Sequence, residues 1–63
     1  MAIWFAPGSH QGIQAELRAD SSADVADLPA FADANFLKPG SSCLVIGASE
    51  LYMMDSENNW KQM

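Results

Sequence analysis

Residues 40–63, GSSCLVIGASELYMMDSENNWKQM, are the stretch that decides the fold. Three short apolar runs, near residues 42–46, 50–55 and 59–63, are separated by two breaks, as in a three-stranded antiparallel meander. The first break, residues 47–49, contains Gly47, which tolerates a positive φ. The second, residues 55–59, consists of Asp, Ser, Glu and Asn, and most of these side chains bond to nearby backbone and favour turns. The sequence therefore predicts that the C-terminal part of the chain is a meander.

Both faces of this meander are expected to be apolar. If each strand alternates, one face carries Leu44, Ile46, Tyr52 and Met54, and the other carries Cys43, Val45, Leu51 and Met53. Tyr52 and Trp60 lie on either side of the second turn and are expected to pack as a cross-strand aromatic pair. The predicted hairpin and interface residues are Leu51, Tyr52, Met53, Met54 and Trp60.

The rest of the chain predicts short strands and one short helix. Residues 3–6 are apolar and end at Pro7, and residues 13–19 alternate between apolar and polar, which favours a strand. A helix over 13–19 is the competing interpretation, since Ile13 and Leu17 are four residues apart. Residues 20–24 have the composition of a loop. A helix is predicted over 28–37, with Asp27 as N-cap and Pro39 preventing its continuation.

These elements predict a β-rich α+β fold in a single small domain spanning residues 1–63. A chain of 63 residues is near the lower limit for a self-sufficient core, and small proteins escape this limit through disulfides, metals or association. Cys43 is the only cysteine and His10 the only histidine, which excludes an intrachain disulfide and argues against a four-ligand zinc site. Association is therefore the expected source of additional stability.

Charge and hydropathy argue against two classes of partner. Eight Asp and Glu against three Lys and Arg give a net charge of −5, without the basic clusters that neutralise nucleic-acid phosphates. The acidic residues are dispersed, which is typical of a solvated surface. No apolar run approaches the roughly 20 residues of a membrane span, and the N-terminus lacks the pattern of a secretory signal. We expect no nucleic-acid partner and no membrane.

No residue pattern predicts an enzyme. His10 lies in a Gly-Ser-His-Gln-Gly stretch typical of a surface loop, and no nucleophile motif surrounds Ser9. Cys43 lies inside an apolar strand with no neighbour that would form a thiolate. The alternating oxygen ligands of residues 55–59 lack the glycine and distal Glu of a calcium loop. We therefore expect no catalytic, cofactor or metal site.

One combination of features covers residues 40–63: Gly40, the apolar residues 44–46, Ser49, the Leu51-Tyr52 pair, the turn at 55–59 and Trp60. This combination resembles small virion-associated and fibre proteins of tailed bacteriophages. The resemblance implies a non-enzymatic head or fibre accessory protein of a phage or prophage particle, made in the bacterial cytoplasm and located in the virion. Its partners would be other copies of itself, as a trimer or dimer, and another virion protein.

Two other classes of function remain open. One is a small acidic phage-encoded inhibitor that binds a host protein, and the other is a subunit of an enzyme complex whose catalytic residues lie elsewhere.

Overall fold

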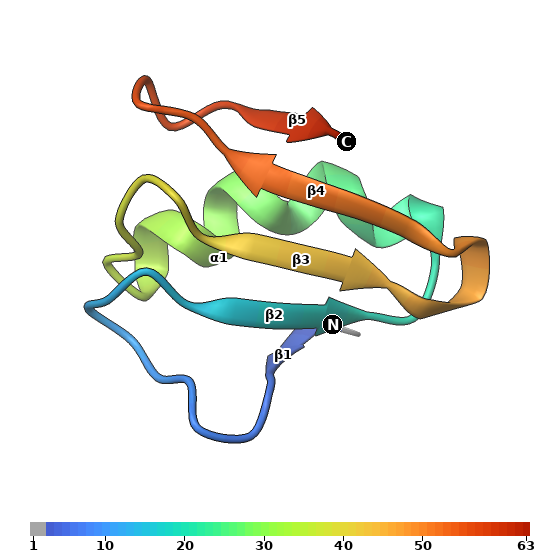
Figure 1. Cartoon of the computed structure of the whole chain (residues 1–63), viewed down its shortest axis with the longest axis horizontal. Helices are drawn as coiled ribbons and strands as arrows, with labels where there is room; N and C mark the ends of the chain where they lie inside the picture. The colour runs from blue at the N-terminus through green and yellow to red at the C-terminus, as the bar shows by residue number, and fades with distance from the viewer. Residues whose placement is uncertain (1–2) are drawn as a thin grey trace.

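The computed structural model describes residues 3–63, which form a mixed five-stranded sheet with one α-helix (Figure 1). The strands are β1 (Ile3–Phe5), β2 (Glu16–Ala19), β3 (Ser42–Val45), β4 (Glu50–Met54) and β5 (Trp60–Gln62). They lie side by side in sequence order. All neighbouring pairs are antiparallel except β2 and β3, which are parallel. The structure is therefore α+β and β-rich, as predicted.

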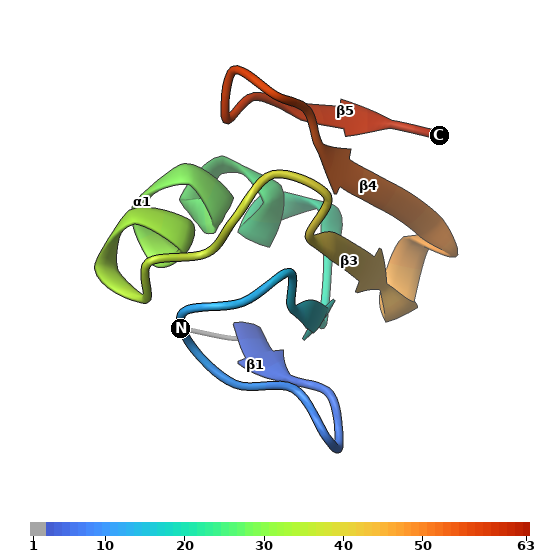
Figure 2. The same cartoon turned by 60° about the vertical axis from the view of Figure 1, so that its left-hand side comes forward.

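The main helical segments, η1 (Ser22–Asp27) and α1 (Leu28–Ala34), connect the two parallel strands, β2 and β3. The 3-10 helix η1 leads directly into α1, and a second 3-10 turn, η2 (Ile46–Ala48), joins β3 to β4. Parallel neighbours need such a crossover, whereas antiparallel neighbours need only a short turn. Figure 1 shows α1 behind β3 and β4, and Figure 2 shows it to one side of the sheet. The helix thus covers a single face.

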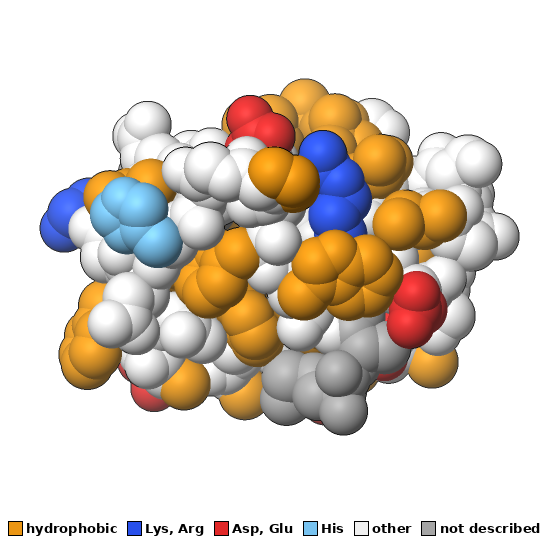
Figure 3. Space-filling view, turned by 90° about the horizontal axis from the view of Figure 1, so that it is seen from below, with side chains coloured by type: hydrophobic (Ala, Val, Ile, Leu, Met, Phe, Trp, Pro, Cys, Tyr) orange, Lys and Arg blue, Asp and Glu red, His pale blue; other side chains and the backbone are white. Residues whose placement is uncertain are grey.

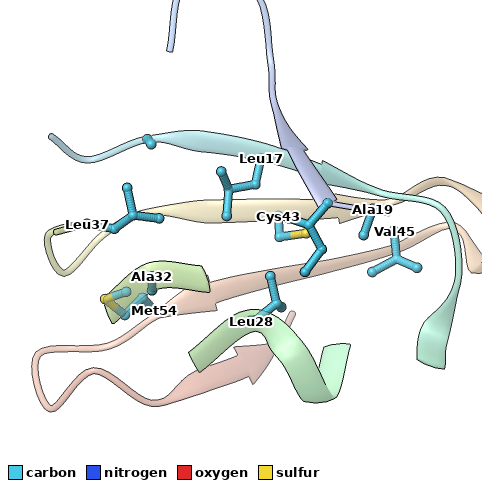
Figure 4. Packing of buried hydrophobic residues seen from close by; sticks show 10 residues of the cluster. Leu17, Ala19, Leu28, Ala32, Leu37, Cys43, Val45 and Met54 are labelled. Atoms are coloured by element: carbon cyan, nitrogen blue, oxygen red, sulfur yellow. The ribbon is translucent and has the colours of Figure 1, made fainter. Parts of the chain in front are cut away.

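The core lies between α1 and the covered face of the sheet (Figure 4). Leu17, Cys43 and Val45 point toward the helix from β2 and β3 and are fully buried. Leu28 and Ala32 point back from α1, and their spacing of four residues places them on one side of the helix. The remaining buried apolar residues of the cluster are Ile3, Ala15, Ala19, Leu37 and Met54.

The predicted meander is present in part. β3, β4 and β5 are consecutive antiparallel neighbours, but β3 also pairs with β2, so they belong to one larger sheet. The predicted division of faces is wrong. Cys43 lies opposite Tyr52, and Leu44 lies opposite Leu51, because four residues, 46–49, separate the paired Val45 and Glu50. Cys43 therefore shares the covered face with Tyr52, whereas Leu44 and Leu51 share the other.

The first turn uses Gly47 differently from the prediction. The left-handed residue is Ser49, with φ 53°, rather than Gly47. Gly47 is required for space, since a Cβ there would lie 2.4 Å from the carbonyl oxygen of Asp20. The Gly47 N–H donates to that same oxygen at 2.9 Å. This contact fixes the β3–β4 turn against the end of β2.

The second turn follows the predicted chemistry. One carboxylate oxygen of Asp55 accepts hydrogen bonds from the backbone N–H groups of Glu57 and Asn59, both at 2.9 Å. The bond from Asn59, with smaller contributions from Glu57 and the nearby Lys61, lowers the pKa of Asp55 below its usual value. Asn58 adopts a positive φ of 64°. The side chain of Asp55 therefore organises the whole β4–β5 connection.

Three predictions for residues 3–24 need correction, two in the length of a strand and one in the type of structure. Strand β1 ends at Phe5, one residue earlier than predicted. Strand β2 begins at Glu16, because the Ile13 carbonyl accepts from Lys38 N–H and the Gly12 N–H donates to Asn35, both outside the sheet. Residues 20–24 are not a simple loop, since η1 begins at Ser22.

The helix is shorter than predicted and is capped differently. Asp27 makes no side-chain hydrogen bond at the start of α1, because it also ends η1 and is itself helical in φ and ψ. At the other end, Leu37 N–H donates to Ala32 O and Phe36 N–H donates to Asp33 O. This is a Schellman motif, with Phe36 at the left-handed position, φ 55°, where glycine is usual. The motif ends α1 before Pro39 can do so.

Candidate interaction surface

The sheet face on the side away from α1 contributes no residue to the core cluster, and we call it the open face. Its side chains come from the positions that alternate with the buried ones in each strand. Trp4, Leu44 and Leu51 are 42%, 37% and 41% exposed. Cross-strand pairing shows which side chains share this face. They are Trp4, Glu16, Arg18, Ser42, Leu44, Leu51, Met53 and Lys61.

The open face is mainly apolar at its centre. Leu44 and Leu51 are direct partners on β3 and β4, and Met53 lies next to Leu51 on the same face of β4. Figure 3 views the molecule from the β1 edge of the sheet, and at that edge hydrophobic side chains lie around a basic one. Exposed apolar side chains that are contiguous in this way usually mark an interaction site.

The predicted interface residues fall on two different faces. Leu51 and Met53 lie on the open face, whereas Tyr52, Met54 and Trp60 lie on the covered face and pack on the core. Trp60 is the partner of Met54, and Tyr52 is the partner of Gln62. The two aromatics are therefore diagonal neighbours and do not face each other directly. Trp4 and Leu44 were not among the predicted interface residues. Each is next to a core-facing residue, Phe5 or Val45, and this alternation could have indicated that they face outward.

Trp60 and Tyr52 differ in how their polar atoms are satisfied. The indole N–H of Trp60 is buried and finds no acceptor among residues 3–63. The Tyr52 hydroxyl donates to Glu50 at 3.5 Å, and the other oxygen of Glu50 accepts from the Gln62 amide at 3.2 Å. Desolvation and the nearby Glu50 carboxylate raise the pKa of Tyr52. Both rings pack against the core, and Tyr52 in addition hydrogen-bonds within the chain.

A second, smaller surface lies between α1 and the β4–β5 turn. A groove of about 410 Å³ is lined by Pro29, Ala30, Ala32, Asp33, Phe36, Leu37, Met54 and Asn58. Phe36 is 74% exposed and holds a backbone conformation that is uncommon for a bulky residue. The lining contains a single carboxylate, from Asp33, and no nucleophile, so it offers no pair of groups for acid–base catalysis.

The residues considered for chemistry do not form a reactive group. Burial raises the pKa of the Cys43 thiol to about 11, despite the opposing effect of Arg18. A thiol of this kind is a core residue and a poor nucleophile. His10 is exposed and its Nδ1 bonds to the Gln11 carbonyl, while the Ser9 hydroxyl accepts from the Glu16 N–H. Among residues 3–63, no three His, Cys, Asp or Glu side chains are grouped to hold a metal ion.

Comparisons with protein-family models, curated proteins and solved structures gave no match to this chain. Within residues 3–63, no helix has the length and apolar character needed to cross a membrane.

Proposed function

We propose that this protein is a non-enzymatic structural component that acts by self-assembly through its open face. The observation that carries the proposal is the group of Leu44, Leu51 and Met53 on a sheet face that α1 does not cover. These side chains make no contribution to the core on the other side of the sheet. A second copy that covers them would remove apolar area from water. Each Å² buried in this way stabilises the assembly by about 25 cal/mol.

The proposed place of assembly is a bacteriophage or prophage particle, with the protein as a head or fibre accessory. The resemblance of residues 40–63 to phage hairpin proteins supports this location. The hairpin that carries it, β4–β5, supplies Leu51 and Met53 to the open face.

Charged substitutions on the open face test the proposal. Leu51→Asp would bury an unpaired carboxylate in the assembly, which is strongly unfavourable. We expect it to raise the dissociation constant by about 100-fold or more, measured by sedimentation velocity at about 0.15 M salt. Met53→Asp places its carboxylate beside Lys61 of the same chain and should weaken the assembly less. Far-UV circular dichroism checks that each variant remains folded.

A matched control carries the same added charge away from the face. Gln11→Asp lies in the exposed loop before β2 and should leave the assembly unchanged. Ser22 is a poorer control, because its hydroxyl donates to Glu50. A wild-type protein that stays monomeric at high micromolar concentration would refute self-assembly. That result would favour an inhibitor that uses the open face to bind a different protein.

A further inference from the structure

The outward side chains of the open face form two rows that cross the strands. The first row is Trp4, Arg18, Leu44 and Leu51, from β1 to β4. Met63 extends it beside β4, since its N–H donates to Leu51 O at 2.8 Å. The second row is Glu16, Ser42, Met53 and Lys61, from β2 to β5.

The second row carries opposite charges at its two ends. Glu16 and Lys61 are both exposed, and three strand spacings of about 4.8 Å separate them, or about 14 Å. They are therefore too far apart to form an ion pair within one chain. Ser42 and Met53, which lie between them, are uncharged. A row with this pattern is complementary to its own copy when one of the two is reversed.

We propose that a second copy of the chain packs on the open face about a two-fold axis that runs along the strands between β3 and β4. The inference rests on the proposed self-assembly and specifies its geometry. The rotation reverses the second row, so Glu16 of each copy lies opposite the partner's Lys61. It also places Leu44 opposite the partner's Leu51 at the centre, and Ser42 opposite the partner's Met53. Charge pairs at the rim around an apolar centre are the usual anatomy of a specific interface.

The alternative two-fold axis, perpendicular to the strands, fits the face less well. It would place Glu16 opposite the partner's Arg18 and Leu51 opposite the partner's Met53, but Leu44 opposite the partner's Ser42. The Arg18 guanidinium is already engaged with its own backbone, since Nη1 donates to Leu17 O at 3.1 Å. The axis along the strands instead keeps the two most central leucines together, where binding energy is concentrated.

The same arrangement leaves β1 at the margin of the assembly. Reversal about the axis between β3 and β4 carries β1, and with it Trp4, beyond β5 of the other copy, in a layer about 10 Å away. Sheets that pack face to face align within about 30°, an offset that the long side chains of Glu16 and Lys61 can span.

Charge-reversal variants test the axis. Glu16→Lys alone places two lysines opposite each other in each pair, and Lys61→Glu alone places two glutamates opposite each other. Each homodimer should weaken by about 10-fold or more. Mixing the two variants restores an opposite-charge pair at both sites, so the mixture should form a heterodimer with affinity within about threefold of the wild type. Native mass spectrometry distinguishes the heterodimer from the homodimers when one of the two variants is uniformly labelled with 15N, because Glu and Lys have nearly the same mass.

The outcomes separate this inference from the proposed function. If the wild type is monomeric, both fail. If the wild type is a dimer but the charge variants bind as it does, or if the wild type forms only trimers, the two-fold axis alone is wrong. If Arg18→Glu rescues Glu16→Lys and Lys61→Glu does not, the axis is perpendicular to the strands. Because Lys61 lies near Asp55, the double variant carrying both reversals in one chain, which should dimerise as the wild type does, controls for damage to the turn.

Discussion

Trp60 offers a direct test of which contacts stabilise the folded chain. The ring packs against the core from the covered face of β5, but the residue is only partly buried. Truncating a buried Trp to Ala costs about 3–5 kcal/mol. The buried indole N–H, which finds no acceptor among residues 3–63, already destabilises the native state by about 1–3 kcal/mol, and Ala removes that penalty. The difference between the two ranges is centred near 2 kcal/mol, so we expect Trp60→Ala to lower the free energy of unfolding by about 2 kcal/mol.

Trp60→Phe separates the two contributions. Phe retains an aromatic ring against the core and removes the unsatisfied N–H, so the free energy of unfolding should change by less than about 1 kcal/mol. Urea unfolding followed by far-UV circular dichroism measures both variants. All samples need the same protomer concentration, since association stabilises the folded state by mass action.

Two results would refute this reasoning. If Trp60→Phe destabilises as much as Trp60→Ala, the indole N–H is hydrogen-bonded in solution and the stated environment of Trp60 is wrong. If Trp60→Ala is well folded and has lost only self-association, Trp60 is an interface anchor instead of a core residue.

The two turns of the C-terminal strands give further tests. Gly47→Ala should lower the free energy of unfolding by about 1–3 kcal/mol, because the new Cβ would meet the Asp20 carbonyl. Ser49→Gly should change it by less than about 1 kcal/mol, since glycine adopts the positive φ freely. Urea midpoints compare the two variants, and equal losses of stability would contradict the steric argument. The folded pKa of Asp55 lies below its unfolded value, so its contribution to stability is present above about pH 4 and is lost as the pH falls through the folded pKa. Asp55→Ala should lower the urea midpoint at pH 7 and make it less sensitive to acid, and a variant that retains the full wild-type acid dependence would assign that dependence to other carboxylates.

The sequence predicted the local chemistry of the C-terminal half better than its geometry. The role of Asp55 in the second turn was predictable because its carboxylate bonds only to residues two and four positions along the chain. The pairing of Cys43 with Tyr52 depended on the number of residues between Val45 and Glu50. A shift of one residue in that number exchanges the two faces of a strand. When both faces of a strand are apolar, the sequence does not show whether this number is odd or even, and so does not show which face is buried.

The end of α1 shows a second limit of local reasoning. Pro39 and Gly40 suggested that the helix runs to residue 37, but the Schellman motif ends it at Ala34. Nothing in the local sequence indicates a left-handed Phe36, because a bulky residue is disfavoured there by about 1–2 kcal/mol. Tertiary contacts must supply that energy. The buried Leu37, which follows directly, is the contact that the motif places on the core.

The identity of the residues on the open face is the strongest argument that this protein has a partner. A helix of seven residues, Leu28–Ala34, can cover only one side of a five-stranded sheet, and the buried core lies entirely on that side. Polar side chains in place of Leu44, Leu51 and Met53 would leave that core intact, since these residues point away from it. The stability of a single chain therefore does not account for their apolar character. A surface that is covered in the proposed assembly would account for it, and the opposite charges of Glu16 and Lys61 would then orient the second copy.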